Sequence, residues 1–503
     1  MDDEFKQRFR AAKSARGEGI ETEGYEVYKF CFNGREDEWS GKSGRYREPE
    51  EVFADIVAGV AEDFTGDLFH TLTPENTDWV AYEAGVAVSE DDEQAVKDAI
   101  AGRERIIAKS LKSSNYYDEG PTAFQDAAFG TVAMWVDRPT FSSPITFEAV
   151  PCSELYLRLG PRGIEDRFRC GKYFYSDLEQ LLPGATFPRD IKDAMRGAGQ
   201  AKVTWGFWRD YSDPDSPVWK QAVRVDDKEV GLDKTLGAEG SCPLLVGRFN
   251  AVPKSPWGRG PARRMLPTLR VLDELVRMNL EAMDHRLDPA IVYPHDGILD
   301  FSDGIEAGIA YPAMPGSADS IREILGGELD YGFFTEERIE ERIRDGFYRD
   351  LPQKGKTPPS ASQYMGEEQK QVRRMARPAG KLWKELGVGI LVRTEWLESQ
   401  AGGALEGVEP VLSEGRVVSI RPISPLERAQ ARDEVVTAQG IMAMAQESLG
   451  PQQAMLVIDG VRTMNNVKAA LKDKLVEFRD EKQLQQAAEL FMMNQGGAGE
   501  PQQ

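Results

Sequence analysis

The sequence predicts an α+β protein of several domains, and three observations support that prediction. The chain has 503 residues, more than one hydrophobic core usually supports, so two or more domains are expected. Apolar residues recur every second position between residues 145 and 249, and every third or fourth position on either side of that stretch. A long amphipathic helix, bounded by glycine and proline, follows the strand-rich stretch and indicates a connection between two bodies.

Residues 1–144 are predicted to be mainly helical. The segment Val52–Phe69 is amphipathic and ends before the turn at Leu72-Thr73-Pro74, and Asp92–Ser110 has a second helical pattern. The apolar run Phe124–Trp135 indicates a helix that leads into a strand.

Residues 145–255 carry the alternation that is typical of strands. The alternating phrases are ITFEAVP, SELYLRL, IEDRFRC, VTWGFWRD and PVWKQAVRV, and two of them flank a Gly-Pro-Arg-Gly turn. A small β-barrel or sandwich is the natural interpretation, with LEQLLP and AMRGA as inserted helical pieces.

Residues 256–289 contain the long helix. At about 1.5 Å per residue, the stretch from Leu266 to Asp288 would span roughly 35 Å, and Asp288-Pro289 should stop it. Its apolar residues follow helical spacing and predict one buried stripe: Met265, Leu266, Leu269, Leu272, Leu275, Val276, Leu280, Met283 and Leu287. The charged remainder, including Arg270, is expected to face solvent or a partner.

The next two segments are predicted to be a small module and a returning helix. Residues 290–334 are rich in Gly, Pro and Asp and read as a compact loop-and-strand module. Residues 335–350 form the helix, with Thr335 as its expected N-cap and with Ile339, Ile343 and Phe347 on one face.

The last third of the chain is predicted to be largely helical. Residues 351–360 form a proline-containing loop, and residues 361–424 contain a helix with a kink or break at Pro378 and a strand at Arg416–Pro422. Residues 425–494 read as several helices. The low apolar content of residues 495–503 predicts disorder.

Composition excludes several classes of protein. With 62 Lys+Arg against 84 Asp+Glu, the formal charge is −22, which argues against a general nucleic-acid binder. The four cysteines lack CxxC spacing and are expected to be reduced and structural, and the three histidines are too few and too scattered for a metal site. No apolar run is long enough for a membrane span, and the charged N-terminus lacks a signal core, so a cytoplasmic protein is expected.

Motifs give no support for catalysis or a cofactor. Gly355-Lys356-Thr357 ends like a P-loop, but Asp350 stands where the first glycine belongs and Pro358 where the helix should begin. The sequence contains no HExxH, GxSxG or EF-hand pattern. We therefore expect no catalytic residue, no cofactor and no metal, and we interpret Lys354 and Lys356 from spacing alone as part of an exposed connector.

Taken in order, several phrases resemble the portal, or head-to-tail connecting, proteins of short-tailed phages. The chain has Leu72-Thr73-Pro74 with Trp79 soon after, and Phe129-Gly130-Thr131 before the strands. FEAVP at Phe147–Pro151 precedes a glycine hairpin at Gly163 and a strand with Arg169. GRGP followed by the LPTL helix that ends in Asp-Pro, Gly258–Pro289, is the most specific phrase. The segment Thr357–Glu367 departs from the family, which often has a threonine-rich run there.

The resemblance implies a ring, commonly of twelve subunits, at one vertex of the capsid of a virion that is assembled in the host cytoplasm. It implies a conduit for DNA packaging and ejection, with the terminase motor, a tail adaptor, and the major capsid and scaffolding proteins as partners and no membrane. The implied parts are a helical wing (1–144), a β-rich wing barrel (145–255), two stem helices (256–289 and 335–350), a clip (290–334), a tunnel loop (351–360), a kinked helix and wing strand (361–424), a helical crown (425–494) and a disordered tail (495–503).

Two sets of site residues follow from that resemblance. Double-stranded DNA in the channel would meet the tunnel loop through Gln353, Lys354, Lys356 and Thr357. The stem would contact neighbouring subunits through Leu269, Leu272, Val276, Leu280, Ile339 and Ile343. Two alternatives stay open: another virion component such as a tail adaptor, and an enzyme of nucleic-acid metabolism with an appended β-barrel.

Overall fold

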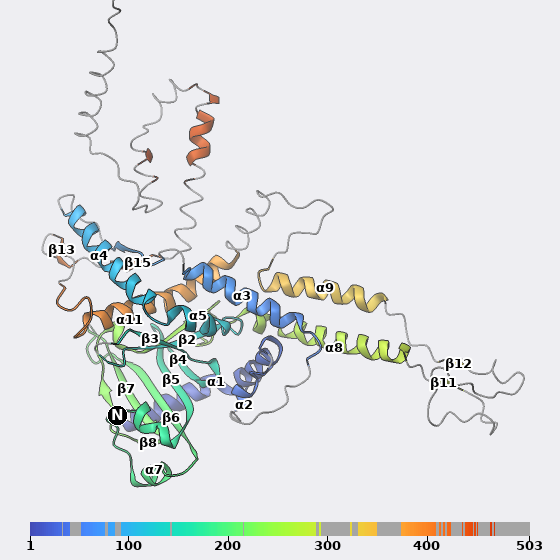
Figure 1. The fold of residues 1–503 in the computed structure, drawn as a ribbon, viewed down its shortest axis with the longest axis horizontal. Coiled ribbons are helices and arrows are strands. Elements are labelled where there is room, and N and C mark those ends of the chain that lie inside the picture. Colours follow the sequence, from blue (N-terminus) through green and yellow to red (C-terminus); the bar gives the residue numbers. More distant parts are fainter. Residues whose placement is uncertain are drawn as a thin grey trace, which may run out of the picture. The chain divides into compact units, whose positions relative to one another are not determined.

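The fold contains both helices and strands, as the sequence predicted, and along the chain the strand-rich middle is preceded and followed by helices (Figure 1). The computed structural model describes residues 1–32, 34–40, 52–75, 79–85, 92–140, 143–214, 216–287, 291–292, 322–323, 330–349, 374–408, 412–413, 416–417 and 420–423, with short helical pieces between 435 and 467. The chain divides into two units, Met1–Pro422 and Ile423–Gln503, and the description below concerns the first.

Most of the first 125 residues are helical. The first helix contains a non-helical residue, Gly17 at φ 56°, which separates an N-terminal half from a C-terminal half. Left-handed φ values cost least at glycine, so the break falls where the chain can turn without strain. The helices are α1 (Asp2–Cys31), α2 (Asp37–Ser40), α3 (Ile56–Leu72), α4 (Glu93–Lys112) and α5 (Tyr116–Gln125).

Two antiparallel sheets form the strand-rich middle. The smaller has the order β10-β2-β3 and the larger the order β4-β5-β6-β7-β8, with β9 also paired to β7. The strands are β2 (Thr131–Asp137), β3 (Thr146–Ala149), β4 (Leu155–Gly160), β5 (Gly163–Phe174), β6 (Gln200–Asp210), β7 (Val218–Val225), β8 (Lys228–Glu229), β9 (Lys234–Thr235) and β10 (Leu244–Arg248). The short helices α6 (Leu178–Leu181) and α7 (Arg189–Ala194) are inserted between β5 and β6.

Strand alternation explains how the larger sheet is covered on both faces. Trp205 and Phe207 of β6 contact Trp135 of β2, at ring-centroid distances of 5.8 and 5.5 Å. On the opposite face, the neighbouring residue Trp208 contacts Phe5 of α1 at 6.4 Å. Successive side chains of a strand point to opposite faces, so β6 packs the small sheet on one side and α1 on the other.

The buried carboxylate of Asp126, which follows α5, is hydrogen-bonded to α1 and to the residues before β4. Asp126, 2% exposed, accepts hydrogen bonds from the Tyr28 hydroxyl of α1 and from the backbone N–H of Cys152, the latter at 2.8 Å. The Arg35 guanidinium lies 4.0 Å away. Burial raises the pKa of Asp126 to about 6, although Arg35 and the two hydrogen bonds act in the opposite direction.

The long helix and its returning partner are α8 (Pro261–Leu287) and α9 (Asp330–Gly346). Between them, β11 (Ile291–Val292) pairs with β12 (Arg322–Glu323). Residues 330–334 of the expected module belong to α9, and its other residues lie outside the described part of the chain. The expectation that Thr335 caps α9 was wrong, because the helix begins five residues earlier. Asp330 is an acidic residue, which suits the first turn of a helix, so residue type alone did not exclude the earlier start.

Two further expectations need correction. The helix does not break at Pro378, because residues 374–382 are helical through it. The irregular turn is a π-helical segment at Trp383–Gly387, which leads into α11 (Val388–Ser399). Arg416–Pro422 is not one strand. Its first part, β14 (Arg416–Val417), pairs with β13 (Leu412–Ser413), whereas β15 (Ile420–Pro422) pairs with β1 (Tyr82–Ala84). The first half pairs with its neighbour in the chain and the second with a strand more than 300 residues away, a difference that periodicity cannot reveal.

Candidate functional site

The paired helices α8 and α9 are the candidate site, and a cluster of glycines holds the start of α8. Gly260 donates to the Phe129 carbonyl at 2.9 Å, and Phe249 donates to the Gly130 carbonyl at 2.9 Å. A Cβ on Gly130, at φ 124°, would lie 2.3 Å from the Gly260 nitrogen. Only glycine permits this φ together with so close a backbone approach, which explains why the phrases at 129–131 and 258–260 are both glycine-bearing.

One face of α8 is buried within the subunit. Leu269 and Leu272 are fully buried, and Leu266 is 4% exposed. Arg263 and Arg270 of α8 form ion pairs with Glu23 and Glu26 of α1, so the C-terminal half of α1 lies along this helix. This face therefore serves the fold of the subunit itself.

Helix α9 packs beside α8 over part of its length (Figure 1). A Cβ on Gly346 would lie 2.8 Å from the Met265 sulfur, and Ile343 is fully buried. Further along the pair, the Asn279 side-chain amide donates to a Glu336 carboxylate oxygen at 2.9 Å. The two helices are thus held together by close packing near Gly346 and by a hydrogen bond farther out.

Aromatic rings anchor the end of α9 to α3 and to the residue that follows β10. Phe64 of α3 lies 6.1 Å from Phe347 and 6.0 Å from Tyr348, and Phe249 after β10 also contacts Tyr348. Arg349 pairs with Asp63 of α3. These contacts hold the C-terminal end of α9 against α3 and the end of β10.

The other side of α8 carries a second apolar stripe, which nothing in the described part of the chain covers fully. Val271 and Met278 are 55% and 54% exposed. Their neighbours at helical spacing complete the apolar ridge, which is Pro267, Val271, Leu275, Met278 and Ala282. Large apolar side chains exposed side by side on a soluble protein mark a contact surface.

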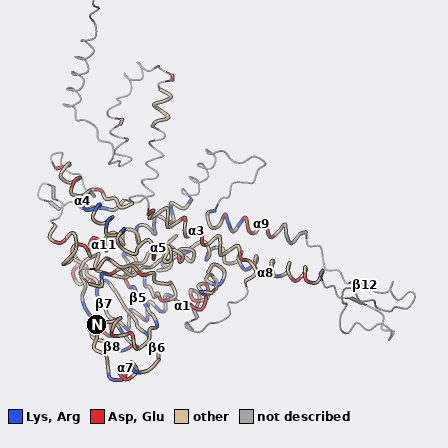
Figure 2. The backbone as a smooth tube through the Cα atoms, in the orientation of Figure 1, with Lys and Arg blue, Asp and Glu red and all other residues tan. Residues whose placement is uncertain are grey.

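A charged ladder runs beside the apolar ridge. Arg277 donates to Glu274 and to Glu281, three and four residues away, and all three side chains are exposed. These hydrogen bonds lower the pKa of Glu274. Figure 2 shows acidic and basic residues interspersed along α8 and α9. An apolar centre with a charged border is the usual composition of a protein–protein interface.

Comparison with known proteins gives the setting of this surface. A family model described as bacteriophage head to tail connecting protein matches residues 2–471. The chain belongs to this family. It is therefore a structural component that joins head and tail in a phage particle, and we refer to it below as the connector.

Curated proteins and solved structures were also compared with the connector. No curated protein matches the connector with significant similarity. Among solved structures, it resembles a chain from the neck of an empty GTA particle computed with C6 symmetry, at 12% identity over 86% of the connector and 98% of that chain. The TM-score of 0.34 is too low for that likeness to support a structural argument.

The structure separates the residues that the sequence grouped as the stem contact. Leu269, Leu272 and Ile343 are buried inside the subunit, and Val276 and Ile339 are half-buried. Leu280 is 49% exposed. Whether any of them touches a neighbouring subunit stays a prediction.

Sequence reasoning missed Val271 and Met278, two exposed members of the apolar ridge. It counted one apolar stripe on α8 and left these two residues aside because they fall on the side that was assigned to charges. Their seven-residue spacing, two helical turns, was the signal that could have identified a second stripe.

The other expected site lies outside the described residues. This holds for all four tunnel-loop positions, Gln353, Lys354, Lys356 and Thr357. Among the residues that are described, the four cysteines are free, and no cluster of His, Cys, Asp or Glu could hold a metal ion. No helix in that part of the chain has the length and apolar content to cross a membrane.

Proposed function

We propose that the connector assembles into a ring, commonly of twelve copies, at one capsid vertex, and that the apolar ridge of α8 contacts the neighbouring copy. The observation that carries this proposal is the pair of apolar faces on α8, one buried within the subunit and one exposed. In this proposal the exposed face of one copy meets a different surface of the next copy, which makes the contact head-to-tail. Such contacts close into a ring when the rotation between copies is regular.

The parts of the ring follow the family resemblance. We assign residues 1–144 to a helical wing, 145–255 to its β-rich part, 290–329 to a clip, 351–360 to a tunnel loop, 361–424 to a helix and short wing strands, 425–494 to a crown and 495–503 to a disordered tail. The stem consists of 256–289 and of the returning helix, whose start we move from residue 335 to Asp330. The clip would dock the terminase motor and later the tail adaptor, and the major capsid and scaffolding proteins would surround the ring. We further propose a purely structural role without catalysis, assembly in the host cytoplasm and no contact with a membrane.

The charge of the chain suits a conduit for double-stranded DNA. Each copy carries a formal charge of −22, and mostly acidic or neutral channel walls would repel phosphates and let the duplex slide. A basic lining would instead bind DNA with a steep salt dependence. Lys354 and Lys356 would then supply a limited number of phosphate contacts in the channel.

The ridge is tested by the double substitution Val271→Asp and Met278→Asp. Because both side chains are exposed, the subunit should fold normally, whereas ring formation should be lost since charges would be buried at the contact. Native mass spectrometry and negative-stain microscopy, with and without capsid and scaffolding proteins, measure the outcome against rings of about twelve times 56.1 kDa. Lys192→Asp on exposed α7 changes the charge by the same two units and should still form rings. Rings of normal size from the double variant would contradict the ridge as the contact.

The tunnel-loop lysines are tested separately by Lys354→Glu with Lys356→Glu. We expect rings of normal mass but slower packaging or poorer retention of DNA, because like charges would face the phosphates. Packaging rate and DNA retention in particles are the measurements. Normal values for both would remove Lys354 and Lys356 from the channel model while leaving the ridge untouched.

A further inference from the structure

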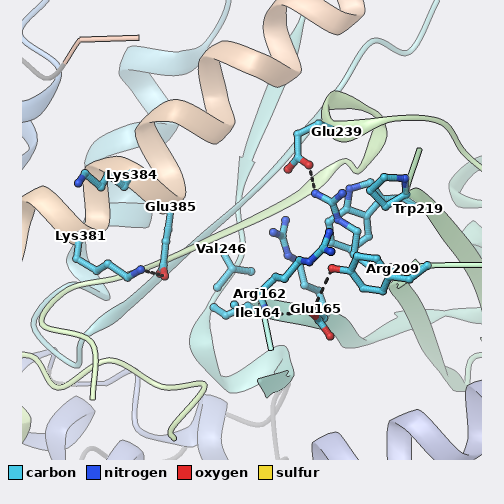
Figure 3. Close-up of a pocket in the computed structure, with 14 residues that line it drawn as sticks. Arg162, Ile164, Glu165, Arg209, Trp219, Glu239, Val246, Lys381, Lys384 and Glu385 are labelled. Carbon is cyan, nitrogen blue, oxygen red and sulfur yellow. Dashed lines mark hydrogen bonds and ion pairs between the residues drawn. The ribbon is translucent and has the colours of Figure 1, made fainter. Parts of the chain in front are cut away.

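A second feature of the body is a cavity of about 450 Å³ between the larger sheet and the helix that contains Lys381 and Lys384. Figure 3 shows Lys381, Lys384 and Glu385 entering from that helix, with Arg162, Arg209 and Trp219 across from them and Val246 between. None of these residues belongs to α8 or α9. The cavity is therefore separate from the apolar ridge.

The walls of the cavity are cationic in a chain that is strongly acidic. Five basic residues (Arg162, Arg167, Arg209, Lys381 and Lys384) face three glutamates (Glu165, Glu239 and Glu385). Two of the five are paired, since Arg209 bonds to Glu239 and Lys381 to Glu385 at 3.0 Å. Within the described part of the chain, no carboxylate forms an ion pair with Arg162, Arg167 or Lys384. The cavity therefore has cations to spare.

Aromatic rings hold three of the guanidinium groups in place. Trp219, 1% exposed, has Arg167 at 4.7 Å and Arg209 at 4.5 Å from its ring centre. Arg162 lies 4.9 Å from the Tyr211 ring, and the Tyr211 hydroxyl donates to Glu165 at 3.1 Å. Stacking on a ring restricts a guanidinium without using its N–H donors. Apart from the bonds of Arg209 to Glu239 and of Arg167 to the Leu244 carbonyl, the donors of these groups stay available to an anion.

Two nitrogen donors in residues that line the cavity are buried without an acceptor in the described part of the chain. Arg167 spends one nitrogen on the Leu244 carbonyl at 2.7 Å, but its Nε is buried and has no acceptor among the described residues. The Trp219 Nε1 is in the same position. Both nitrogens are closed to solvent, so an occupant of the cavity would be held by the spare cations rather than by these donors.

The mixture of groups selects the kind of anion. The stiff backbone of double-stranded DNA would bring full negative charges against Glu165, Glu239 and Glu385, and its width prevents it from entering so small a cavity. A peptide with acidic side chains suits the walls better. Its carboxylates would meet the spare cations, its backbone N–H groups could donate to the glutamates, and its carbon atoms could contact Ile164 and Val246.

We propose that this cavity binds an acidic peptide segment, from another copy of the connector or from another protein of the particle. The sequence itself contains one run of four consecutive acidic residues, Glu90–Glu93, so a second copy is one possible source. Recognition depends on fixed cations in a concave site and goes beyond ring formation. It can be measured on the subunit whether or not the ring closes.

The test is fluorescence anisotropy with the intact connector and two labelled peptides at low salt. One peptide is SEDDEQ, the sequence of Ser89–Gln94, and the other is DESEQD, with the same composition in another order. Saturable binding of both, weakened by salt, supports recognition of acidic peptides in general, and tighter binding of SEDDEQ supports a second copy as the source. Failure of both peptides to bind overturns the proposal.

Matched variants locate the binding. Arg162→Gln with Lys384→Gln removes two exposed cations that stabilise no ion pair, so we expect a loss of about tenfold or more in affinity with unchanged folding. Lys192→Gln with Arg196→Gln removes two exposed cations at and just after α7, away from the cavity, and should leave affinity within about twofold. Equal losses from both pairs would show unspecific attraction and would overturn the site.

Discussion

The face of α8 that carries Leu269 and Leu272 and the face that carries Val271 and Met278 are both apolar, yet their surroundings differ. The first face packs against the body and α9, and its leucines are fully buried. The second leaves more than half of Val271 and Met278 in solvent. An apolar stripe therefore predicts that a helix face is buried, but it does not indicate whether the same chain or another one buries it.

The comparison is sharpest when one substitution is placed on each face. Leu272→Asp removes a fully buried side chain and buries an unpaired charge, so we expect the free energy of unfolding to fall by about 4 kcal/mol or more. Urea or thermal unfolding of the isolated subunit measures this loss. It is the largest effect that we predict.

Val271→Asp is the matched control one residue away. Because Val271 is 55% exposed, the same change in stability should stay within about 0.5 kcal/mol. A large loss of stability for Val271→Asp would mean that the apolar ridge is covered within the subunit, and the ring contact would have to be sought elsewhere.

A second contrast concerns two carboxylates, Asp126 in the buried core and Glu274 on the exposed ladder. Burial raises the pKa of Asp126 from the ordinary 3.8 to about 6, so the folded connector keeps a proton that the unfolded chain has released. Stability should therefore fall as the pH rises from about 4 to about 6, by up to about 3 kcal/mol from this group.

Asp126→Asn should remove that dependence, because an amide does not titrate. The measurement is the free energy of unfolding at several pH values for the connector and for the variant, whose difference cancels the other titrating groups. The variant will be less stable overall, since an amide cannot satisfy both the Tyr28 and Cys152 donors as a carboxylate does. A difference that stays constant between pH 4 and 6 would show that Asp126 titrates normally.

The exposed ladder should give the smallest effect. Arg277→Gln breaks the bonds to Glu274 and Glu281, but all three side chains are solvated and exposed ion pairs contribute little. We expect the unfolding midpoint to stay within experimental error. If the ladder borders a subunit contact, ring formation at low salt, where exposed charges are least screened, should respond to this variant more than the stability of the subunit does.

The sequence predicted the class and order of the elements well. Period-two alternation identified β3 to β7, and three-and-four spacing identified α3, α4 and α8, because these patterns reflect which side of an element faces the core. Element ends were predicted less well. Helix α9 begins at Asp330, five residues before the expected cap at Thr335, and Pro378 lies within a helix.

The candidate sites depended on information that spacing does not contain. Arg162, Arg167 and Lys384 are far apart in the chain, and nothing in their local patterns indicates that they line one cavity. The phrases at 129–131 and 258–260 were recognised as family features, but only the structure shows that their glycines lie against each other.

By itself, then, the sequence determined that the connector would have a long helix with an apolar face, a strand-rich middle and an acidic balance, since periodicity and charge are properties of the chain alone. The tertiary structure decided which face of α8 is buried and which is open. It also decided which cations keep a carboxylate partner and which do not. Burial and pairing depend on what the rest of the chain places opposite a residue, and that is settled only when distant segments pack together.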